Sequence, residues 1–232
     1  MAREIHDHYF RQAKREGYLS RAAYKLIEID DRKQVLKEGD GVVDLGAAPG
    51  SWLQVASERV GAGGFVVGID LKPIRLPRPL PNVRTIVGDA REVSAEEILG
   101  AAGCEPGSPN AAHGGLFRVV LSDMAPSTTG DRTIDHHGSM RLCHVVLARC
   151  GELLAPGGNL VLKALEGEAY PELLARCRRL FDAVKGFKPK ASRSISSEMY
   201  IIARGYRGPA ADRVREEASG AGRRPSRGWG GG

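Results

Sequence analysis

Short apolar segments that alternate with helical stretches constrain the fold of this chain more than any other feature of its sequence. The apolar segments cover residues 41–45, 65–70, 83–89, 117–123 and 159–163, and each has the length and composition of a buried strand. Helical stretches at residues 51–60, 94–99, 134–154 and 171–184 separate several of them. This alternation predicts an α/β fold with a mostly parallel sheet and helices on both faces. Residues 198–206 are predicted to add a last strand at the end of the sheet, with an antiparallel direction left open.

The two ends of the chain differ from this alternating region. Residues 19–35 carry apolar side chains at a spacing that predicts a helix, with Ser20 available as its cap. We assign residues 1–37 as the basic, helical N-terminal part of a single domain that spans residues 1–208. Residues 209–232 are rich in Arg and Gly and have little to bury, so they are predicted to be a disordered tail. Residues 100–115 are predicted to form a surface loop.

Positive charge is concentrated at both ends of the chain. Lys and Arg number 34 against 28 Asp and Glu, for a net charge of +6. Basic and acidic side chains number six and three in residues 1–25, 14 and 19 in residues 26–171, and 14 and six in residues 172–232. This balance favours a nucleic acid or another polyanion as partner. A charge excess of this size can also serve solubility alone.

The cysteines and the apolar runs favour a cytoplasmic protein. The four cysteines, Cys104, Cys143, Cys150 and Cys177, form no C-x-x-C pair, which fits a reducing compartment. Cys143 and Cys150 are seven residues apart on one predicted helix face and are expected in the core. No apolar stretch at the N-terminus resembles a signal peptide, and none elsewhere approaches the ~18 residues of a membrane span.

Four successive predicted strands end in a carboxylate, and the first of them opens into a glycine loop. The carboxylates are Asp44, Asp70, Asp89 and Asp123, and the loop covers residues 46–50. Ligands of open α/β sheets bind at the carboxyl ends of the strands, near the point where strand order reverses. Any one of these aspartates could instead be a helix cap or a turn former. All four together with the loop predict a ligand site at this edge of the sheet.

The spacing of the loop glycines distinguishes between two classes of ligand. A dinucleotide fingerprint has the form G-x-G-x-x-G, whereas here Gly46 and Gly50 are four residues apart with Pro49 between them. This spacing disfavours a nicotinamide enzyme and favours one that uses S-adenosylmethionine (SAM). Asp70 is then placed to accept hydrogen bonds from ribose hydroxyls, and Asp89 follows the strand where adenine would lie.

Four sequence motifs resemble those of the FtsJ/RrmJ family of SAM-dependent ribose 2′-O-methyltransferases. They occur at residues 44–52, 122–126, 162–163 and 196–200, and the resemblance covers residues 18–204. The resemblance implies a Rossmann-like methyltransferase fold with a mostly parallel, seven-stranded sheet. It further implies that the substrate is a uridine in the A loop of 23S rRNA in the large ribosomal subunit. We also expect a monomer, and methyl transfer of this kind needs no metal.

The resemblance also implies which residues act in catalysis and cofactor binding. The catalytic set would be Lys25, Asp123, Lys163 and Glu198. The SAM-binding set would be Gly50, Trp52, Asp70, Asp89 and Asp123.

The chemistry of methyl transfer to a hydroxyl gives each catalytic residue a role. The hydroxyl oxygen must lie in line with the methyl group and lose its proton as it attacks. Our hypothesis is that Lys163 accepts this proton, and that Lys25 favours the neutral form of Lys163 and helps to position the ribose. Asp123 and Glu198 would orient the two lysines.

Structural roles are the alternatives for the same residues. Lys163 could form a surface ion pair with Glu166 or Glu168, and Lys25 could lie on a solvated helix face. Glu198 could be only a charge at the start of a strand, and Trp52 could be core packing. His136, His137 and His144 match no common metal spacing and are expected to be solvent-exposed or capping residues.

The sequence departs from the family pattern at two places. Ser127 follows Pro126 where relatives often carry Asn, and Leu165 and Glu166 replace a familiar Phe-Gln pair. The Arg-rich tail is also absent from the family pattern, and could add phosphate affinity or be idle. Within the same enzyme class, the substrate could be tRNA or mRNA. In another class, the protein could be a catalytically idle RNA-binding ribosome assembly factor.

Overall fold

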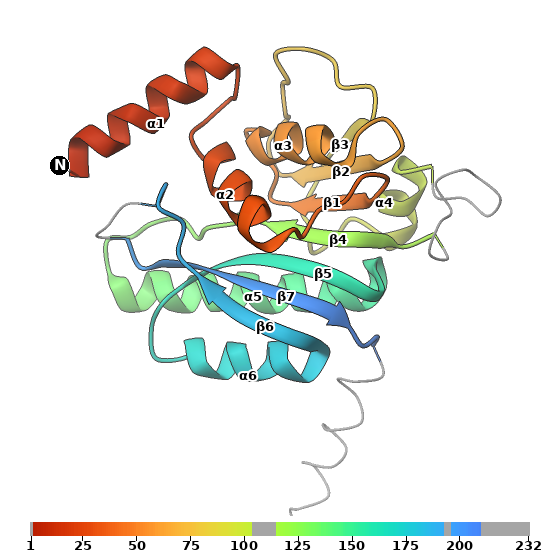
Figure 1. Ribbon diagram of the computed structural model, residues 1–232. Coiled ribbons are helices and arrows are strands. Elements are labelled where there is room, and N and C mark those ends of the chain that lie inside the picture. The colour runs from red at the N-terminus through yellow and green to blue at the C-terminus, as the bar shows by residue number, and fades with distance from the viewer. Residues whose placement is uncertain (1, 104–114, 193–195, 210–232) are drawn as a thin grey trace, which may run out of the picture.

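The computed structural model describes residues 2–103, 115–192 and 196–209 of the 232-residue chain. Seven strands form one sheet: β1 (Gly41–Leu45), β2 (Phe65–Asp70), β3 (Val83–Val87), β4 (Phe117–Ser122), β5 (Leu154–Leu165), β6 (Phe181–Phe187) and β7 (Glu198–Tyr206). Six helices accompany them: α1 (Ala2–Glu16), α2 (Ala23–Lys33), α3 (Ser51–Val60), α4 (Ala95–Ala101), α5 (Arg132–Leu153) and α6 (Tyr170–Leu180). The α/β fold with a mostly parallel sheet is confirmed (Figure 1).

The strand order of the sheet is β3-β2-β1-β4-β5-β7-β6. Strands β1 to β5 run parallel, and β7 pairs antiparallel with both β5 and β6. From β1 the chain moves outward through β2 and β3, and then returns to place β4 on the other side of β1. The strand order therefore reverses between β1 and β4, which is where ligands of such sheets bind.

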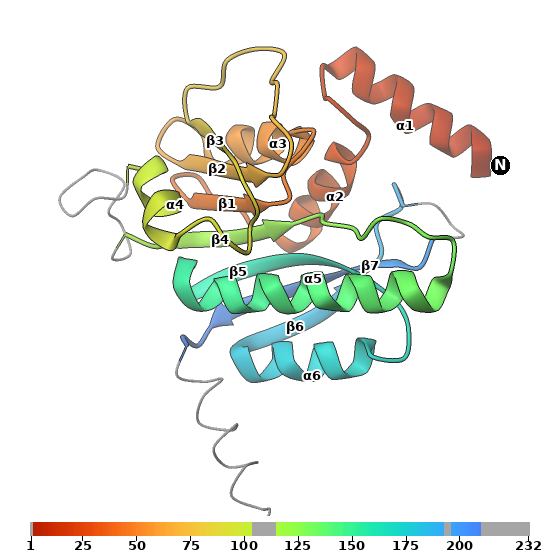
Figure 2. The ribbon, with the colours of Figure 1, turned by 180° about the vertical axis from the view of Figure 1, so that it is seen from behind.

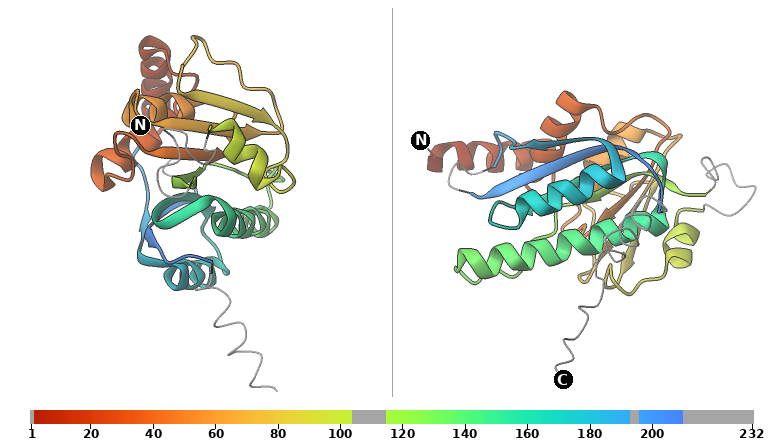
Figure 3. Two further views of the ribbon diagram at one scale, coloured as in Figure 1. Left: turned by 90° about the vertical axis from the view of Figure 1, so that its right-hand side faces the viewer. Right: turned by 90° about the horizontal axis from the view of Figure 1, so that it is seen from below.

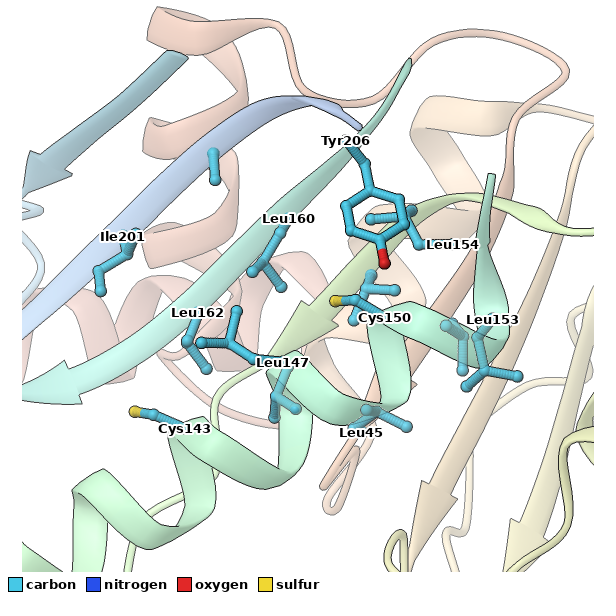
Figure 4. Close-up of a cluster of buried hydrophobic side chains, with 14 of the residues drawn as sticks. Leu45, Cys143, Leu147, Cys150, Leu153, Leu154, Leu160, Leu162, Ile201 and Tyr206 are labelled. Atoms are coloured by element: carbon cyan, nitrogen blue, oxygen red, sulfur yellow. The ribbon is translucent and has the colours of Figure 1, made fainter. Parts of the chain in front are cut away.

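Helices cover both faces of the sheet (Figure 3), and a buried hydrophobic cluster lies on each side. Helices α2 and α3 pack on one face, where Leu26 and Leu53 belong to the same buried cluster as Val161 of β5. Helices α4, α5 and α6 cover the other face (Figure 2). In this second layer, Leu147 and Cys150 of α5 pack beneath Leu160 of β5 (Figure 4). Cys143 and Cys150 are both buried, as predicted.

The predicted helix at residues 171–184 was too long. Helix α6 ends at Leu180, and the chain continues as strand β6, which pairs with β7 from Phe181↔Tyr206 to Phe187↔Tyr200. The physical reason is that pairing with β7 satisfies the backbone of this segment and overrides its local helical character. Strand β7 is antiparallel, but β6 covers its outer side, so β7 does not lie at the end of the sheet.

The helix predicted at residues 19–35 is shorter in the structure, where it is α2. Helix α2 starts at Ala23, its N-cap is Ala22, and it has no side-chain cap hydrogen bond. Ser20 instead bonds to the Ser51 hydroxyl at 2.8 Å, which joins this segment to α3. Part of the predicted surface loop is helical, because α4 extends to Ala101. Residues 104–114, which include Cys104, and residues 210–232 of the predicted tail lie outside the described residues.

Candidate active site

A cavity of about 560 Å³ opens at the carboxyl ends of the first four strands. This volume is within the usual range for small-molecule sites, roughly 300–1,000 Å³. Three of the predicted site residues, Asp70, Asp89 and Asp123, line the cavity together with Gly46 and Met124. The strand-end pattern in the sequence therefore does correspond to one shared pocket at the point where strand order reverses.

The glycine loop after β1 packs so closely that side chains would not fit. A Cβ atom on Gly46 would lie 2.1 Å from the Met124 Cγ, and one on Gly50 would lie 2.9 Å from the Ile74 Cγ2. Both glycines also have positive φ angles, 81° and 111°, which other residues rarely adopt. The loop can thus bring its backbone close to a ligand in the cavity.

Asp70 fixes this loop and keeps capacity for a ligand. Its Oδ2 accepts from the Ala48 amide and its Oδ1 from the Lys72 amide, both at 2.9 Å. A carboxylate has about four acceptor positions. Two remain for donors such as ribose hydroxyls.

Asp89 is held by its neighbour Arg91. The Arg91 Nε lies 2.9 and 3.0 Å from the two carboxylate oxygens, and the Arg91 amide donates to Oδ1 at 2.9 Å. These bonds lower the pKa of Asp89 to about 2. Asp89 is therefore an ionised acceptor at the rim of the cavity.

Asp44 has a different environment from the other strand-end carboxylates. It is 1% exposed, and neither of its oxygens has a hydrogen-bond partner among the residues that the structure describes. Burial raises its pKa well above the ordinary value, and the nearby charges of Asp123 and Asp70 raise it further. Unlike the other three strand-end aspartates, Asp44 does not line the cavity, and a buried carboxylate without a partner costs free energy unless a donor or a cation reaches it.

Two lysines and two carboxylates from four distant segments meet beside the cavity. Lys163 near the end of β5 places its Nζ 3.1 Å from Asp123 Oδ1 and donates to the Asp123 carbonyl oxygen. The same Nζ lies 3.9 Å from Glu198 Oε1 at the start of β7. Lys25 of α2 donates to both Glu198 oxygens at 3.1 Å. All four residues of the predicted catalytic set therefore form one ion-pair network.

The structural alternatives for the two lysines do not match this geometry. Both lysines are buried, at 6% and 7% exposure, so Lys25 is not on a solvated face. Within the described residues, the ion pairs of Lys163 go to Asp123 and Glu198, and none goes to Glu166 or Glu168.

Tyr200 is a member of this network whose role the sequence did not reveal. Its hydroxyl donates to Asp123 Oδ1 at 2.6 Å, and the Lys25 Nζ lies 5.7 Å from its ring centroid. Burial raises the pKa of Tyr200 well above its ordinary value, as do the charges of Asp123 and Glu198. It therefore stays a neutral donor. Its place within the 196–200 motif was the available sequence signal, and the structure sets it opposite Lys163 in the β5–β7 ladder.

Two predicted SAM-binding residues lie outside the cavity wall. Trp52 is 3% exposed, its Nε1 donates to the Ala22 carbonyl at 2.9 Å, and its ring lies 5.8 Å from the Tyr200 ring. Gly50 packs against Ile74 and Leu76. Neither residue lines the cavity; Trp52 links α3 to α2 and to the catalytic network.

The histidines of α5 differ from one another. His137 and His144 are exposed, but His136 is buried, so the expected exposed or capping role is wrong for His136. Its Nδ1 bonds to the Leu165 carbonyl at the end of β5, and its Nε2 accepts from the Ala169 amide just before α6. No group of His, Cys, Asp or Glu suited to a metal ion occurs in the part of the chain that the structure describes. The described helices also include none that is long and apolar enough to cross a membrane.

Comparison with known proteins assigns the family. The family model of FtsJ-like methyltransferases matches residues 18–206 of this chain. The chain belongs to this family. The matched range contains the glycine loop and all four residues of the ion-pair network, whereas α1 lies outside it.

Individual relatives of this FtsJ-like methyltransferase cover most of its length. A Syntrophobacter fumaroxidans protein named ribosomal RNA large subunit methyltransferase E is 45% identical over 87% of this chain and 96% of the relative. A Natronomonas pharaonis protein of the same name is 43% identical over 86% of this chain and 73% of the relative. A crystal structure from Plasmodium falciparum, described as a ribosomal RNA methyltransferase, is 29% identical with a TM-score of 0.68, over 82% of this chain and 100% of that one.

Proposed function

We propose that this methyltransferase transfers a methyl group from SAM to the ribose 2′-hydroxyl of a uridine in the A loop of 23S rRNA. The observation that carries the proposal is the network of Lys25, Asp123, Lys163 and Glu198 beside a carboxylate-lined cavity. The names of the relatives support ribosomal RNA of the large subunit as the substrate. The choice of a 2′-hydroxyl, of uridine and of the A loop rests on the family resemblance.

The residues around the cavity fit SAM. Asp70 has free acceptor positions for the ribose hydroxyls, Asp89 lies at the next strand end for the adenine, and Gly46 allows close approach of the backbone. The unpartnered oxygens of Asp44 fit a positively charged ligand, and SAM carries a sulfonium and an ammonium group. Bound SAM supplies an electrophilic methyl group for transfer.

Lys163 is the general base in the proposed mechanism. In its neutral form, its Nζ would take the proton of the 2′-hydroxyl while the oxygen bonds to the methyl carbon, the methyl–sulfur bond breaks, and the thioether S-adenosylhomocysteine leaves. Asp123 holds the Nζ from one side, and Tyr200 fixes the Asp123 carboxylate through its 2.6 Å hydrogen bond. Lys25 pairs with Glu198, the same carboxylate that lies near the Lys163 Nζ. Lys25 also positions the ribose.

Replacement of the base tests the mechanism. Lys163→Ala is expected to abolish methyl transfer while SAM still binds, because Lys163 does not line the cavity. Transfer would be measured with radiolabelled SAM, and binding by calorimetry. The exposed Lys37 gives the control variant Lys37→Ala, which should keep full activity. Retained turnover by Lys163→Ala would exclude it as the base.

The substrate is tested by offering different RNAs with radiolabelled SAM. The protein is incubated separately with 23S rRNA, intact large subunits and bulk tRNA, and the labelled ribose is mapped. We expect label on one uridine of the A loop. Label in tRNA alone would refute rRNA as the substrate. RNA binding without methyl transfer would indicate a ribosome assembly factor. The same proposal includes action as a monomer, which sedimentation of the purified protein tests, and action in the cytoplasm, which cell fractionation tests.

A further inference from the structure

We propose that three polar side chains of α5, His136, Ser139 and Cys143, act as positioning residues for the proposed base Lys163. They anchor the backbone at the end of β5, where a neighbouring strand is missing. This inference rests on the proposed function, and it adds residues that the ion-pair network itself does not contain.

The end of β5 lacks a neighbour on one side. Its ladder with β4 runs as far as Ser122↔Leu162, where β4 ends and the chain turns away at Asp123. On the other side, the ladder with β7 continues to Leu165↔Glu198. The segment that carries Lys163 therefore depends on partners other than β4 for its remaining backbone groups.

The inward face of α5 supplies these partners. The Cys143 Sγ donates to the Lys163 carbonyl at 3.3 Å, and the Ser139 hydroxyl accepts from the Leu165 amide at 3.0 Å. The His136 Nδ1 lies 2.9 Å from the Leu165 carbonyl oxygen. Residues 136, 139 and 143 are spaced by three and four, so they share one helix face. Their exposures are 5%, 2% and 1%, so water does not compete for these bonds.

His136 also fixes the loop that follows β5. The Ala169 amide donates to the His136 Nε2 at 3.0 Å. Because an amide can only donate, Nε2 must be an acceptor, and the ring proton then lies on Nδ1 and is donated to the Leu165 carbonyl. A Cβ atom on Gly167 would lie 2.5 Å from the ring, so the loop crosses the imidazole at close contact. One side chain thus holds the chain on both sides of this loop.

These contacts bear on catalysis through the position of the Lys163 backbone. The Lys163 Nζ must stay 3.1 Å from Asp123 Oδ1 while it faces the substrate hydroxyl. A displacement of ~1 Å at a reacting group can cost about 100-fold in rate. Loss of the anchors is therefore expected to slow the chemical step and to leave the binding of both substrates unchanged.

The principal test compares Ser139→Ala and His136→Leu with a matched buried control. Cys150 lies two helical turns beyond Cys143 on the same face and is fully buried (Figure 4), so Cys150→Ala perturbs the same layer without contacting Lys163. We expect kcat for rRNA methylation to fall about tenfold to 100-fold in the two anchor variants. KM for RNA and Kd for SAM should change less than about twofold. Cys150→Ala should have the kcat of the wild-type protein. Ser139→Thr retains the hydroxyl, so its kcat should be closer to that of the wild-type protein than to that of Ser139→Ala.

Hydrogen exchange provides a readout that does not need activity. The amides of Leu165 and Ala169 should exchange faster in Ser139→Ala and His136→Leu respectively, and not in Cys150→Ala. If His136→Leu does not fold, Ser139→Ala, which removes a single hydroxyl, decides the question. An equal loss of kcat in Cys150→Ala, or a change confined to KM, would overturn the proposal. If the wild-type protein methylates no RNA, the proposed function fails, and unchanged exchange would separately refute the anchoring.

Discussion

At the scale of single residues, four aspartates that the sequence presents alike have distinct physical states. Asp70 accepts two backbone amides, Asp89 is paired with an arginine, and Asp123 binds Lys163 and Tyr200. Asp44 alone among these four is buried without a partner in the described structure. Burial without compensation costs free energy in the ligand-free protein. In the proposed SAM complex, a cationic group of the ligand would offset that cost.

Asp44→Asn is expected to stabilise the ligand-free protein and to weaken SAM binding. The raised pKa means that the folded state holds this proton more tightly than the unfolded chain. The free energy of unfolding therefore falls as the pH rises from the unfolded pKa through the folded one. The amide side chain of the variant has no carboxylate to ionise. Relative to the wild-type protein, the free energy of unfolding of Asp44→Asn should therefore be about 1–3 kcal/mol higher at pH 7 and almost equal near pH 4.

Thermal unfolding across this pH range and calorimetry with SAM would check the prediction. The exposed Asp182 gives the control Asp182→Asn, which should leave both quantities nearly unchanged. A less stable Asp44→Asn protein at pH 7 would show that the carboxylate is compensated in the fold. Unchanged affinity for SAM would contradict its proposed contact with the ligand.

At the scale of elements, α5 contacts both the cavity and strand β5, which carries Lys163. The loop after β4 leads into this helix, and the Asp131 Oδ1 accepts from the amides of Thr133 and Ile134 at 2.8 and 3.1 Å. This is an N-cap, and its residue type and position are readable from sequence. The inward contacts of the same helix with β5 are not, because they join residues 20 to 33 positions apart.

Asp131→Ala is expected to lower the free energy of unfolding by about 1 kcal/mol, since two amides at the start of α5 lose their acceptor. Denaturant unfolding would measure the change. The adjacent, exposed Arg132 offers the control Arg132→Ala, which should cost less than about 0.5 kcal/mol. Equal losses in the two variants would mean that the cap contributes nothing.

At the scale of the whole molecule, α1 projects at the edge of the sheet towards which β4 points (Figure 1). Ala13 of α1 packs with Tyr24 and Ala191, and Tyr24 donates to Glu16 at 2.8 Å. Away from this contact, α1 exposes Phe10, whose side chain is 60% exposed, and the basic side chains Lys14 and Arg15. Positive charge and an exposed aromatic ring near the catalytic edge suit an RNA backbone and an unpaired base.

Charge reversal at Arg11, Lys14 or Arg15 is expected to weaken RNA binding by about three- to tenfold at low salt and to leave SAM binding unchanged. The reason is that α1 lies outside the cavity wall. Fluorescence titration with rRNA and calorimetry with SAM would measure the two affinities. Lys37→Glu, at the opposite edge of the sheet just before β1, is the control. Equal effects on RNA and SAM would contradict this division of the surface.

The sequence by itself determined the features that depend on near neighbours. Apolar runs predicted the five parallel strands and β7, glycine spacing predicted the loop after β1, and the strand-end aspartates predicted the location of the cavity. These patterns are readable because side-chain periodicity and turn chemistry act within a few residues. The family resemblance added the four members of the ion-pair network, although no local pattern could have joined them.

Only the tertiary structure decided the features that depend on distant partners. It converted residues 181–187 from helix to strand, because β7 offers their backbone a partner. It buried His136 against the end of β5, and it placed Lys25 beside Glu198, which is 173 residues away in the chain. It also left Asp44 uncompensated while its three counterparts gained partners. Burial and pairing set the charge state and position of these groups, and both arise only when distant segments pack together.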